Sequence, residues 1–224
     1  MPSLTQFGTT RVLFVMAAEA EYGPQLQKRF IPLITGVGPV EGAIVTTKAL
    51  AHLKAFGPMP DFVVSIGSAG SATLRKTDIY QITQVSYRDM DASPLGFERG
   101  VTPFLDLPAV LPLPVRLAAV PKATLSTGAN IVSGETYASI DADMVDMETF
   151  AVLRACHQYD LPLIALRGVS DGDEELSDVT DWTEYLHIID EKLAVIVDQM
   201  GESLARSGLS FPGYAAGGAP VELS

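Results

Sequence analysis

The sequence predicts an α/β fold: a single three-layer domain with a central mixed, mostly parallel twisted sheet flanked by helices. Apolar runs of strand length alternate along the chain with segments of helical pattern, which is typical of strands joined by helices. The runs at residues 11–18, 61–66 and 161–169 are almost continuously apolar, as expected of strands buried on both faces. A length of 224 residues suits one such domain.

In the first half of the chain, turn residues separate the predicted elements. Thr35-Gly36-Val37-Gly38 precedes a long helix, and Gly57-Pro58-Met59-Pro60 ends it, because glycine and proline break helices. In order, we predict a strand at residues 11–18, a short helix at 24–30, a helix at 41–56, a strand at 61–66 that ends in a glycine turn at 67–71, and a strand at 78–85.

The second half opens with a connection at residues 87–114 that is punctuated by proline and glycine. A connection of this length is usually functional or covers an interface. There follow a predicted strand at 123–132, a strand at 144–147, a helix through Tyr159, a strand at 161–169, an acidic loop at 171–181 and a final helix at 182–204.

These elements define three regions. Residues 1–10 form a short N-terminal lead, residues 11–205 form the folded domain, and residues 206–224 form a C-terminal tail. The tail is rich in glycine, alanine and proline and poor in core-forming residues, so we expect it to be flexible.

Composition excludes several classes of function. A formal net charge of −12 argues against general attraction to nucleic acid or to an anionic membrane, although a local site can still bind a small anion. One cysteine, Cys156, allows no intramolecular disulfide, and the three histidines have no zinc-binding spacing, so we expect no metal and no cofactor. No apolar run approaches the roughly 20 residues of a membrane span, and the N-terminus does not resemble a signal peptide, so we expect a cytoplasmic protein.

Polar residues gather where the predicted strands end. The strand-end positions carry Glu19 and Glu21, the turn Ser68-Ala69-Gly70, Tyr137, the pair Met147-Glu148, and the pair Ser170-Asp171. In open α/β sheets, ligands bind beyond the carboxyl ends of the strands. The sequence therefore predicts one site that contains several carboxylates.

Such a set of carboxylates suggests chemistry on a glycosidic bond. A carboxyl group kept protonated can donate to a leaving group, while an ionised one activates water. A third can accept a pair of hydrogen bonds from vicinal hydroxyls. Met147 and Tyr137 could contact a sugar face and a planar base. No P-loop and no G-x-G-x-x-G dinucleotide motif is present.

These segments resemble those of a known family. The chain is similar to the purine nucleoside phosphorylase superfamily and, within it, to the 5′-methylthioadenosine/S-adenosylhomocysteine nucleosidases. The matching segments, in order over residues 11–200, are Ala17-Ala18-Glu19-Ala20-Glu21, Thr35-Gly36-Val37-Gly38, Ile66-Gly67-Ser68-Ala69-Gly70, Val132-Ser133-Gly134-Glu135-Thr136-Tyr137, Val145-Asp146-Met147-Glu148-Thr149 and Val169-Ser170-Asp171. The resemblance implies a nucleoside phosphorylase-like fold, hydrolysis of a purine nucleoside to adenine and a thioribose product, and a homodimer.

The resemblance also implies roles for individual residues. Glu21 would activate the attacking water, Asp171 would protonate N7 of the purine, and Glu148 would hold the ribose hydroxyls. The remaining substrate-binding positions are Met147 against the sugar, Tyr137 stacked on the purine, Ser170 supporting Asp171, Trp182 near the base, and the turn Ser68, Ala69 and Gly70.

Local charge favours hydrolysis over phosphorolysis. Phosphorylases of this superfamily carry arginines near the two glycine turns, whereas the corresponding segments here, residues 16–21 and 64–66, contain none. Arg88 or Arg167 could still reach an anion, so a phosphate-dependent phosphorylase stays open. Shorter segments than usual before the first glycine turn and between Tyr137 and Met144 leave futalosine hydrolase, and a degenerate nucleoside-binding protein, as further alternatives.

Simpler explanations exist for each of these residues. Glu21 and Glu148 could be exposed acids in the first turn of a helix, where the helix dipole favours negative charge. Asp171, followed by Gly172, could be a turn residue. Met147 and Tyr137 could belong to the hydrophobic core.

Overall fold

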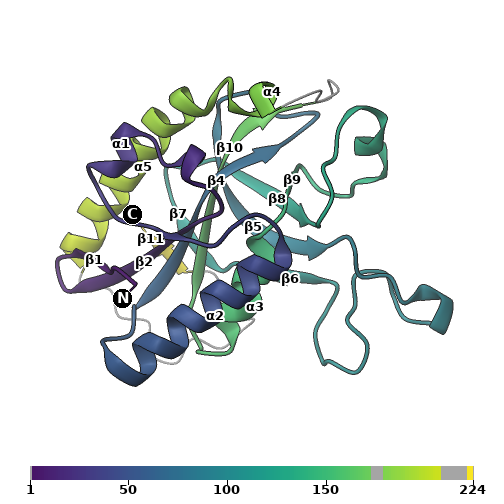
Figure 1. Cartoon of the computed structure of the whole chain (residues 1–224), viewed down its shortest axis with the longest axis horizontal. Coiled ribbons are helices and arrows are strands. Elements are labelled where there is room, and N and C mark those ends of the chain that lie inside the picture. The colour runs from purple at the N-terminus through teal and green to yellow at the C-terminus, as the bar shows by residue number, and fades with distance from the viewer. Residues whose placement is uncertain (1, 173–178, 208–220, 224) are drawn as a thin grey trace.

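The computed structural model describes residues 2–172, 179–207 and 221–223 (Figure 1). A nine-stranded mixed sheet forms its centre, in the order β1-β2-β4-β10-β5-β8-β9, with β3 paired to β2 and β6 paired to β5. Its strands are β1 (Thr5–Phe7), β2 (Thr10–Met16), β3 (Leu33–Ile34), β4 (Phe62–Gly70), β5 (Ile79–Tyr87), β6 (Val110–Pro112), β8 (Lys122–Thr127), β9 (Met144–Asp146) and β10 (Leu163–Asp171). The predicted α/β fold class is confirmed.

Helices cover both faces of the sheet (Figure 1). On one face α1 (Pro24–Gln27) packs on α5 (Leu186–Ser207), and on the other α2 (Pro39–Phe56) packs on α3 (Thr149–His157). The short helix α4 (Val179–Thr183) lies near the end of β10, and the 3-10 helices are η1 (Glu19–Glu21), η2 (Ser93–Leu95) and η3 (Gly134–Ser139). None of the helices in the described ranges is long and apolar enough to cross a membrane.

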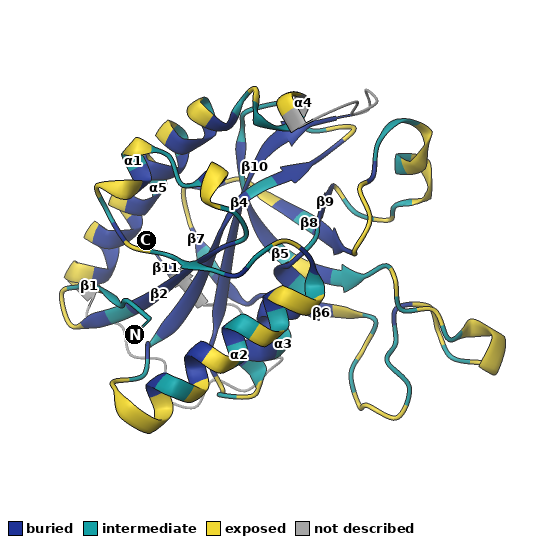
Figure 2. Cartoon of the chain, in the orientation of Figure 1, coloured by how far each residue is buried: buried dark blue, intermediate teal, exposed yellow. Residues whose placement is uncertain are grey.

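Alternating side chains of the central strands supply two separate hydrophobic cores. From β2, Phe14 joins the core beneath α5, whereas Leu13 and Val15 join the core beneath α2 and α3. All nine residues of β10 are buried, which confirms the prediction that this strand is covered on both faces. Figure 2 shows the buried strands between helices whose outer faces are exposed.

Backbone chemistry sets the ends of α2. Gly38 adopts a positive φ of 102°, which favours glycine, and Pro39 then supplies the fixed φ suited to a first helical residue. Gly57 and the prolines that follow end the helix, as predicted. The predicted helix at 24–30 is a single turn at Pro24–Gln27, where Asp190 of α5 accepts the backbone N–H groups of Gln25 and Leu26.

The second glycine segment is strand, which corrects the predicted turn. Residues Gly67 to Gly70 continue β4, because β10 pairs with β4 in parallel along this whole length. The pairing shifts register between Val169 and Asp171, so Asp171 rather than Ser170 is opposite Gly70. A bulge of this kind bends a strand and re-aims its side chains, and here it lies next to the polar residues.

The short strand β9 reaches the site in a way that parallel strand pairing alone does not predict. The strands β2, β4 and β10 are parallel, but β5 is antiparallel to β10, and β5, β8 and β9 then run together in the opposite sense. The end of β9 nevertheless reaches the polar edge of β4, because the sheet curls until Val145 pairs with Gly70. Convergence at this site therefore depends on sheet closure as well as on parallel strands.

Several segments differ from the sequence prediction. The long connection contains β6, the predicted strand at 123–132 ends at Thr127, and β7 (Val115–Leu117) is an additional strand. Within the predicted flexible tail, β11 (Val221–Leu223) pairs in parallel with β7, and Leu223 is buried against the core beneath α5. Most of the predicted acidic loop, residues 173–178, lies outside the described residues.

The predicted N-terminal lead contains β1, which pairs antiparallel to β2. The side chain of Phe7 packs against the core, with its ring edge-on to Phe14, and Gly201 of α5 is the residue over which this ring lies. The lead is thus attached to the folded domain through strand pairing with β2 and through the side chain of Phe7.

Replacing Phe7 should therefore destabilise the whole domain. We expect Phe7→Ala to lower the free energy of unfolding by about 2 kcal/mol, less than for a fully buried phenylalanine. Urea unfolding followed by circular dichroism measures the change. Gln6→Ala, at an exposed position of the same strand, is the matched control and should change stability by less than about 0.5 kcal/mol. Equal stabilities for the two variants would show that β1 is not part of the cooperative unit.

Candidate active site

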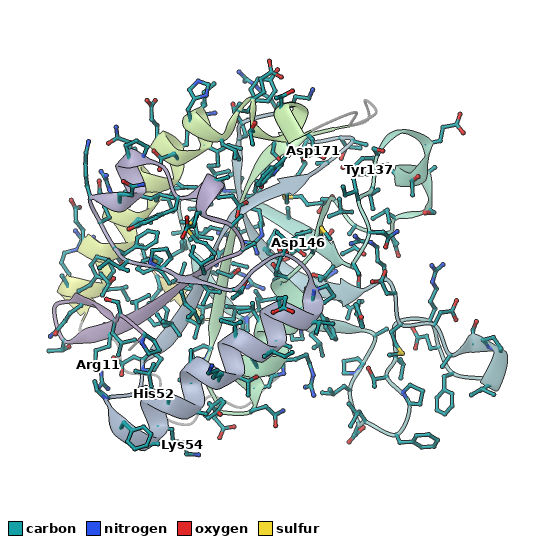
Figure 3. All side chains as sticks on the ribbon, viewed as in Figure 1. Arg11, His52, Lys54, Tyr137, Asp146 and Asp171 are labelled. Carbon is teal, nitrogen blue, oxygen red and sulfur yellow. The ribbon has the colours of Figure 1, made fainter. Side chains whose placement is uncertain are left out.

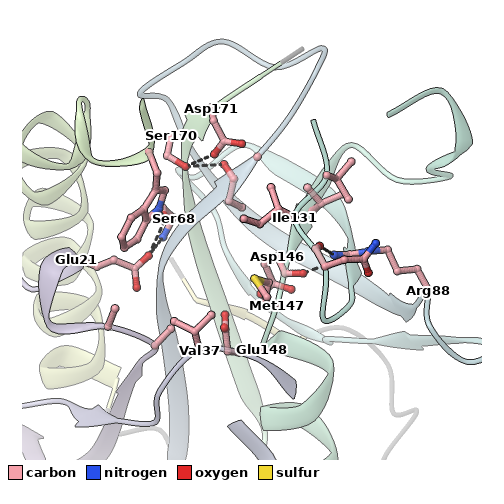
Figure 4. Close-up of a pocket in the computed structure, with 18 residues that line it drawn as sticks. Glu21, Val37, Ser68, Arg88, Ile131, Asp146, Met147, Glu148, Ser170 and Asp171 are labelled. Atoms are coloured by element: carbon pink, nitrogen blue, oxygen red, sulfur yellow. Dashed lines mark hydrogen bonds between the residues drawn. The ribbon is translucent and has the colours of Figure 1, made fainter. Parts of the chain in front are cut away.

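A cavity of about 430 Å³ opens at the ends of β2, β4, β9 and β10 (Figure 4). Nine of the residues that the sequence predicts for the site line it: Glu21, Ser68, Ala69, Gly70, Met147, Glu148, Ser170, Asp171 and Trp182. A concave site with a few converging polar groups is the usual form of a small-molecule site. The structure thus places three carboxylates from distant parts of the chain around one space.

Glu21 ends the 3-10 helix η1 and is buried, whereas its neighbour Glu19 is exposed. Its Oε1 accepts hydrogen bonds from the backbone N–H of Ser68 at 2.7 Å and from the Ser68 hydroxyl at 2.6 Å. Gly67 makes this approach possible, because a Cβ at that position would lie 2.9 Å from Oε1. Burial excludes the simpler reading of Glu21 as an exposed helix-end acid.

Glu148 lies between β9 and α3, with 9% of its surface exposed. Its Oε1 accepts the backbone N–H of Gly38 at 2.7 Å, which ties it to the start of α2. Burial, and after it the nearby negative charge of Asp146, raise the pKa of Glu148 to about 7, although the Gly38 N–H and Arg167 act in the opposite direction. The raised pKa favours the protonated form of Glu148 at neutral pH far more than in an exposed glutamate.

Asp171 is at the bulge in β10, with Ser170 before it. Burial raises the pKa of the Asp171 carboxyl above its ordinary value, and the Ser170 hydroxyl, Lys76 and the Tyr137 hydroxyl partly offset this increase. Ser170 Oγ donates to Asp171 Oδ1 at 2.5 Å, as expected of a residue that supports Asp171. A raised pKa favours the protonated form, which is the form that can donate to a leaving group.

Tyr137 lies beside the cavity rather than among its lining residues. It belongs to the 3-10 helix η3, and Figure 3 labels it close to Asp171. Its hydroxyl is hydrogen-bonded to Asp171 and lies next to Gly70. This position differs from the predicted stacking of the ring on a purine. The structure gives Tyr137 a hydrogen bond to Asp171, which lowers the pKa of that carboxyl.

The spacing of Gly168-Val169-Ser170-Asp171-Gly172 fits the G-x-S-x-G pattern of nucleophilic serines. The structure places Ser170 inside β10 rather than at a strand-to-helix elbow, and its hydroxyl donates to Asp171. Among the described residues, none of those that line the cavity is a histidine. Ser170 therefore lacks both the geometry and the base of a serine nucleophile.

Beneath the cavity lies a buried ion pair that the sequence did not reveal. The Arg167 guanidinium contacts Asp146 Oδ2 at 3.1 Å, with side-chain exposures of 4% and 2%. Further hydrogen bonds join Arg167 to Ser65 Oγ at 2.8 Å and to Thr149 Oγ1 at 2.7 Å. The available signal was an arginine inside a strand that is otherwise apolar, because a buried charge must be paired.

A second, much smaller cavity of about 10 Å³ lies between the carboxylates and this ion pair. Glu21, Glu148, Arg167 and Ser68 are among the residues that line it. Its volume is about that of one water molecule, and these polar groups can supply the two to four partners that such a water needs.

Half of the residues that line the cavity were not predicted from the sequence as site residues. The additional lining residues are Ala17, Ala18, Val37, Arg88, Asn130, Ile131, Val132, Val145 and Asp146. Arg88 donates to the carbonyl oxygens of Ser126, Asp146 and Asn130 at 2.6, 3.0 and 2.6 Å. It therefore holds together the ends of β8 and β9 and the segment after β8, which form this wall. Among the described residues, no group of three or more histidine, cysteine, aspartate or glutamate side chains could hold a metal ion.

Comparison with known proteins agrees with this geometry. Residues 135–201 match the family model of the Phosphorylase superfamily. The 5′-methylthioadenosine/S-adenosylhomocysteine nucleosidase of Neisseria meningitidis, solved with methylthio-immucillin-A, superposes with a TM-score of 0.70 at 20% identity, over 86% of this chain and 99% of that one. The corresponding enzyme of Colwellia psychrerythraea 34H, solved with adenine, gives 0.67 at 22% identity, over 85% and 94%.

A third solved structure, the futalosine hydrolase of Helicobacter pylori, gives a TM-score of 0.67 at 19% identity, over 84% of this chain and 97% of that one. At these identities the likeness establishes the fold. The predicted resemblance to the purine nucleoside phosphorylase superfamily, and its nucleoside phosphorylase-like fold, are thus confirmed.

The raised pKa of Glu148 predicts how stability depends on pH. Folding raises this pKa from 4.5 to about 7, so the folded state binds the proton more tightly than the unfolded state does. The burial of Glu148 therefore costs stability as the pH rises through that interval. Glu148→Gln removes the charge but keeps the oxygen that accepts from Gly38. Its stability relative to the parent should rise with pH, to a gain on the order of 2 kcal/mol above about pH 8.

Urea unfolding at a series of pH values measures this difference. Glu19→Gln, at an exposed position, is the matched control and should show a small difference that hardly changes with pH. A flat difference for Glu148→Gln would mean that Glu148 is ionised to the same extent in the folded and unfolded states.

Proposed function

We propose that the chain hydrolyses the N-glycosidic bond of a purine nucleoside. The observation that carries this proposal is the arrangement of three buried carboxylates, Glu21, Glu148 and Asp171, around one cavity, with a water-sized space between Glu21, Glu148 and Arg167. The superfamily match and the nucleosidase structures with the same fold support it.

Asp171 is proposed as the acid that makes the purine a better leaving group. When the bond between C1′ and N9 breaks, its electron pair passes to the purine ring, and a proton donated by Asp171 to N7 neutralises the charge that develops. Burial and the resulting raised pKa suit this role, and the hydroxyls of Ser170 and Tyr137 orient the carboxyl group. Tyr137 thus acts on the acid rather than on the purine face.

Glu21 is proposed as the base on the water side. The water oxygen forms the new bond to C1′, and Glu21 takes its proton as this bond forms. Two hydrogen bonds from Ser68 hold the Glu21 carboxylate in place. A carboxylate held there would accept the proton and stabilise positive charge on the ribosyl centre.

Glu148 and its neighbours are proposed to hold the nucleoside. Glu148 would accept hydrogen bonds from the two ribose hydroxyls, and Met147 would pack against the sugar. Ser68, Ala69 and Gly70 border the cavity as extended strand, and Trp182 closes it from α4.

Two observations favour water over phosphate as the nucleophile. The space between the acids has the volume of about one water molecule, too small for a phosphate ion. Both arginines that line the two cavities are engaged, Arg167 with Asp146 and Arg88 with three carbonyl oxygens. Negative side chains around the cavity also oppose an anionic nucleophile.

The substrate that we favour is 5′-methylthioadenosine or S-adenosylhomocysteine, with adenine and the thioribose compound as products. Support comes from the structures with the same fold that were solved with methylthio-immucillin-A and with adenine. The futalosine hydrolase structure supports an alternative substrate of the same reaction class. A protein that binds a nucleoside without cleaving it is the non-enzymatic alternative, and the buried base Glu21 argues against it.

The decisive experiment follows adenine release from 5′-methylthioadenosine by absorbance, with and without phosphate. We expect turnover without phosphate, and we expect Asp171→Asn and Glu21→Gln each to lower kcat by about 10²- to 10⁴-fold, as for the loss of a general acid or base. Glu19→Gln, which changes an exposed neighbour of Glu21, should keep the parent activity. Activity that depends wholly on phosphate would reject hydrolysis.

Futalosine in place of 5′-methylthioadenosine tests the alternative substrate in the same assay. Near-normal turnover by both Asp171→Asn and Glu21→Gln would reject the proposed acid and base. Tight calorimetric binding of a nucleoside that stays uncleaved for hours would favour the binding protein.

We further propose a homodimer. The arm at residues 88–109 projects from the domain in Figure 1 and carries apolar side chains that are largely exposed, Phe104 at 95% and Leu95 at 79%. Exposed apolar groups of this kind usually mark an interface. Analytical ultracentrifugation at micromolar concentration should give twice the monomer mass, and Phe104→Glu should shift the protein towards monomer. A parent protein that sediments as a monomer would reject the dimer.

A further inference from the structure

Trp182 is the first member of a series of hydrogen bonds that passes through Ser68 and ends at Glu21. Figure 4 labels Ser68 and Glu21, side by side at the cavity. The indole N–H of Trp182 donates to Ser68 Oγ at 2.9 Å, and the Ser68 hydroxyl donates to Glu21 Oε1 at 2.6 Å. The three residues come from α4, β4 and η1, so these hydrogen bonds join elements that are far apart in the sequence.

The number of protons that each group can donate fixes the direction of these hydrogen bonds. The indole N–H can only donate, and a serine hydroxyl has one proton to donate and lone pairs to accept with. Because Trp182 donates to the serine oxygen, the serine proton is left for the carboxylate of Glu21. The indole therefore keeps the Ser68 hydroxyl in its donating orientation towards Glu21.

Ser68 also orients the carboxylate of Glu21. The backbone N–H and the hydroxyl of Ser68 both donate to Oε1 of Glu21, at 2.7 and 2.6 Å. Among the described residues, these are the hydrogen bonds that hold Glu21, so Oε2 is the oxygen left to take a proton. Glu21 also lines the water-sized cavity, which is where a nucleophilic water would be.

We propose that Trp182 is a positioning residue for Glu21, which it holds through Ser68 as an oriented proton acceptor. This extends the predicted role of Trp182 as a wall of the base pocket, and it rests on the proposed function of Glu21. Trp182 also lines the large cavity, so a nucleoside bound there touches the same ring that orients the base. Seating of α4 and orientation of the base are thereby coupled.

The chain contains a single tryptophan, which allows a test that preserves shape. Biosynthetic replacement of tryptophan by benzothienylalanine changes only Trp182 and exchanges its N–H for sulfur in a ring of the same outline. We expect kcat for adenine release to fall about three- to tenfold, the value of one net hydrogen bond, while KM stays within about twofold. Trp182→Phe should lower kcat in the same way.

Ser68→Ala provides the matched background, because the indole is proposed to act only through the Ser68 hydroxyl. In Ser68→Ala protein, benzothienylalanine should cause no further loss of kcat. A loss of the same size in both backgrounds, or a loss confined to KM, would overturn the proposal, because either result would mean that Trp182 acts by contact with the substrate.

A spectroscopic measurement tests these hydrogen bonds independently of turnover. The single indole N–H gives one resonance in a ¹⁵N-labelled spectrum of the free protein, and Ser68→Ala should move it upfield as the hydrogen bond is lost. Glu21→Gln, which weakens the acceptor of the serine proton, should move it in the same direction by less. An unmoved resonance would overturn the positioning role, whereas a failed assay with shifts as expected would reject only the proposed reaction.

Discussion

The pairing of Arg167 with Asp146 is the interaction on which the site depends. A guanidinium inside a fully buried strand must have its charge and its N–H groups matched, or the fold loses several kcal/mol. Asp146 neutralises it, and Ser65, Thr149 and the Leu166 carbonyl accept further hydrogen bonds. This network joins β4, β9, β10 and the start of α3 into one rigid unit.

This network holds the strand ends that carry the residues lining the cavity. Met147 and Glu148 directly follow Asp146, and Asp171 follows Arg167 by four residues along β10. The ion pair thereby links β9 and β10 next to the ends that border the cavity. The charge of Asp146 also raises the pKa of Glu148, so the structural network and the titration of the site are coupled.

Three chemically similar carboxylates have different surroundings at the cavity. Glu21 receives two donors from Ser68, whereas burial raises the pKa values of Asp171 and Glu148. In the proposed reaction, the raised pKa of Asp171 suits it to donate a proton, and the two hydrogen bonds from Ser68 hold Glu21 in place on the water side. Glycines make the close packing possible, since a side chain at Gly67 would press on Glu21.

The sequence alone determined the fold class and most of the site. Continuous apolar runs identified β2, β4 and β10, and acids at strand ends such as Glu21 and Asp171 identified the cavity, because strand burial and strand-end sites follow from local patterns. Only the tertiary structure placed Tyr137 against Asp171, paired Arg167 with Asp146, and directed Trp182 at Ser68. These contacts join distant residues across a curled sheet and a bulge, and the direction of a side chain there is set by packing that no local pattern encodes.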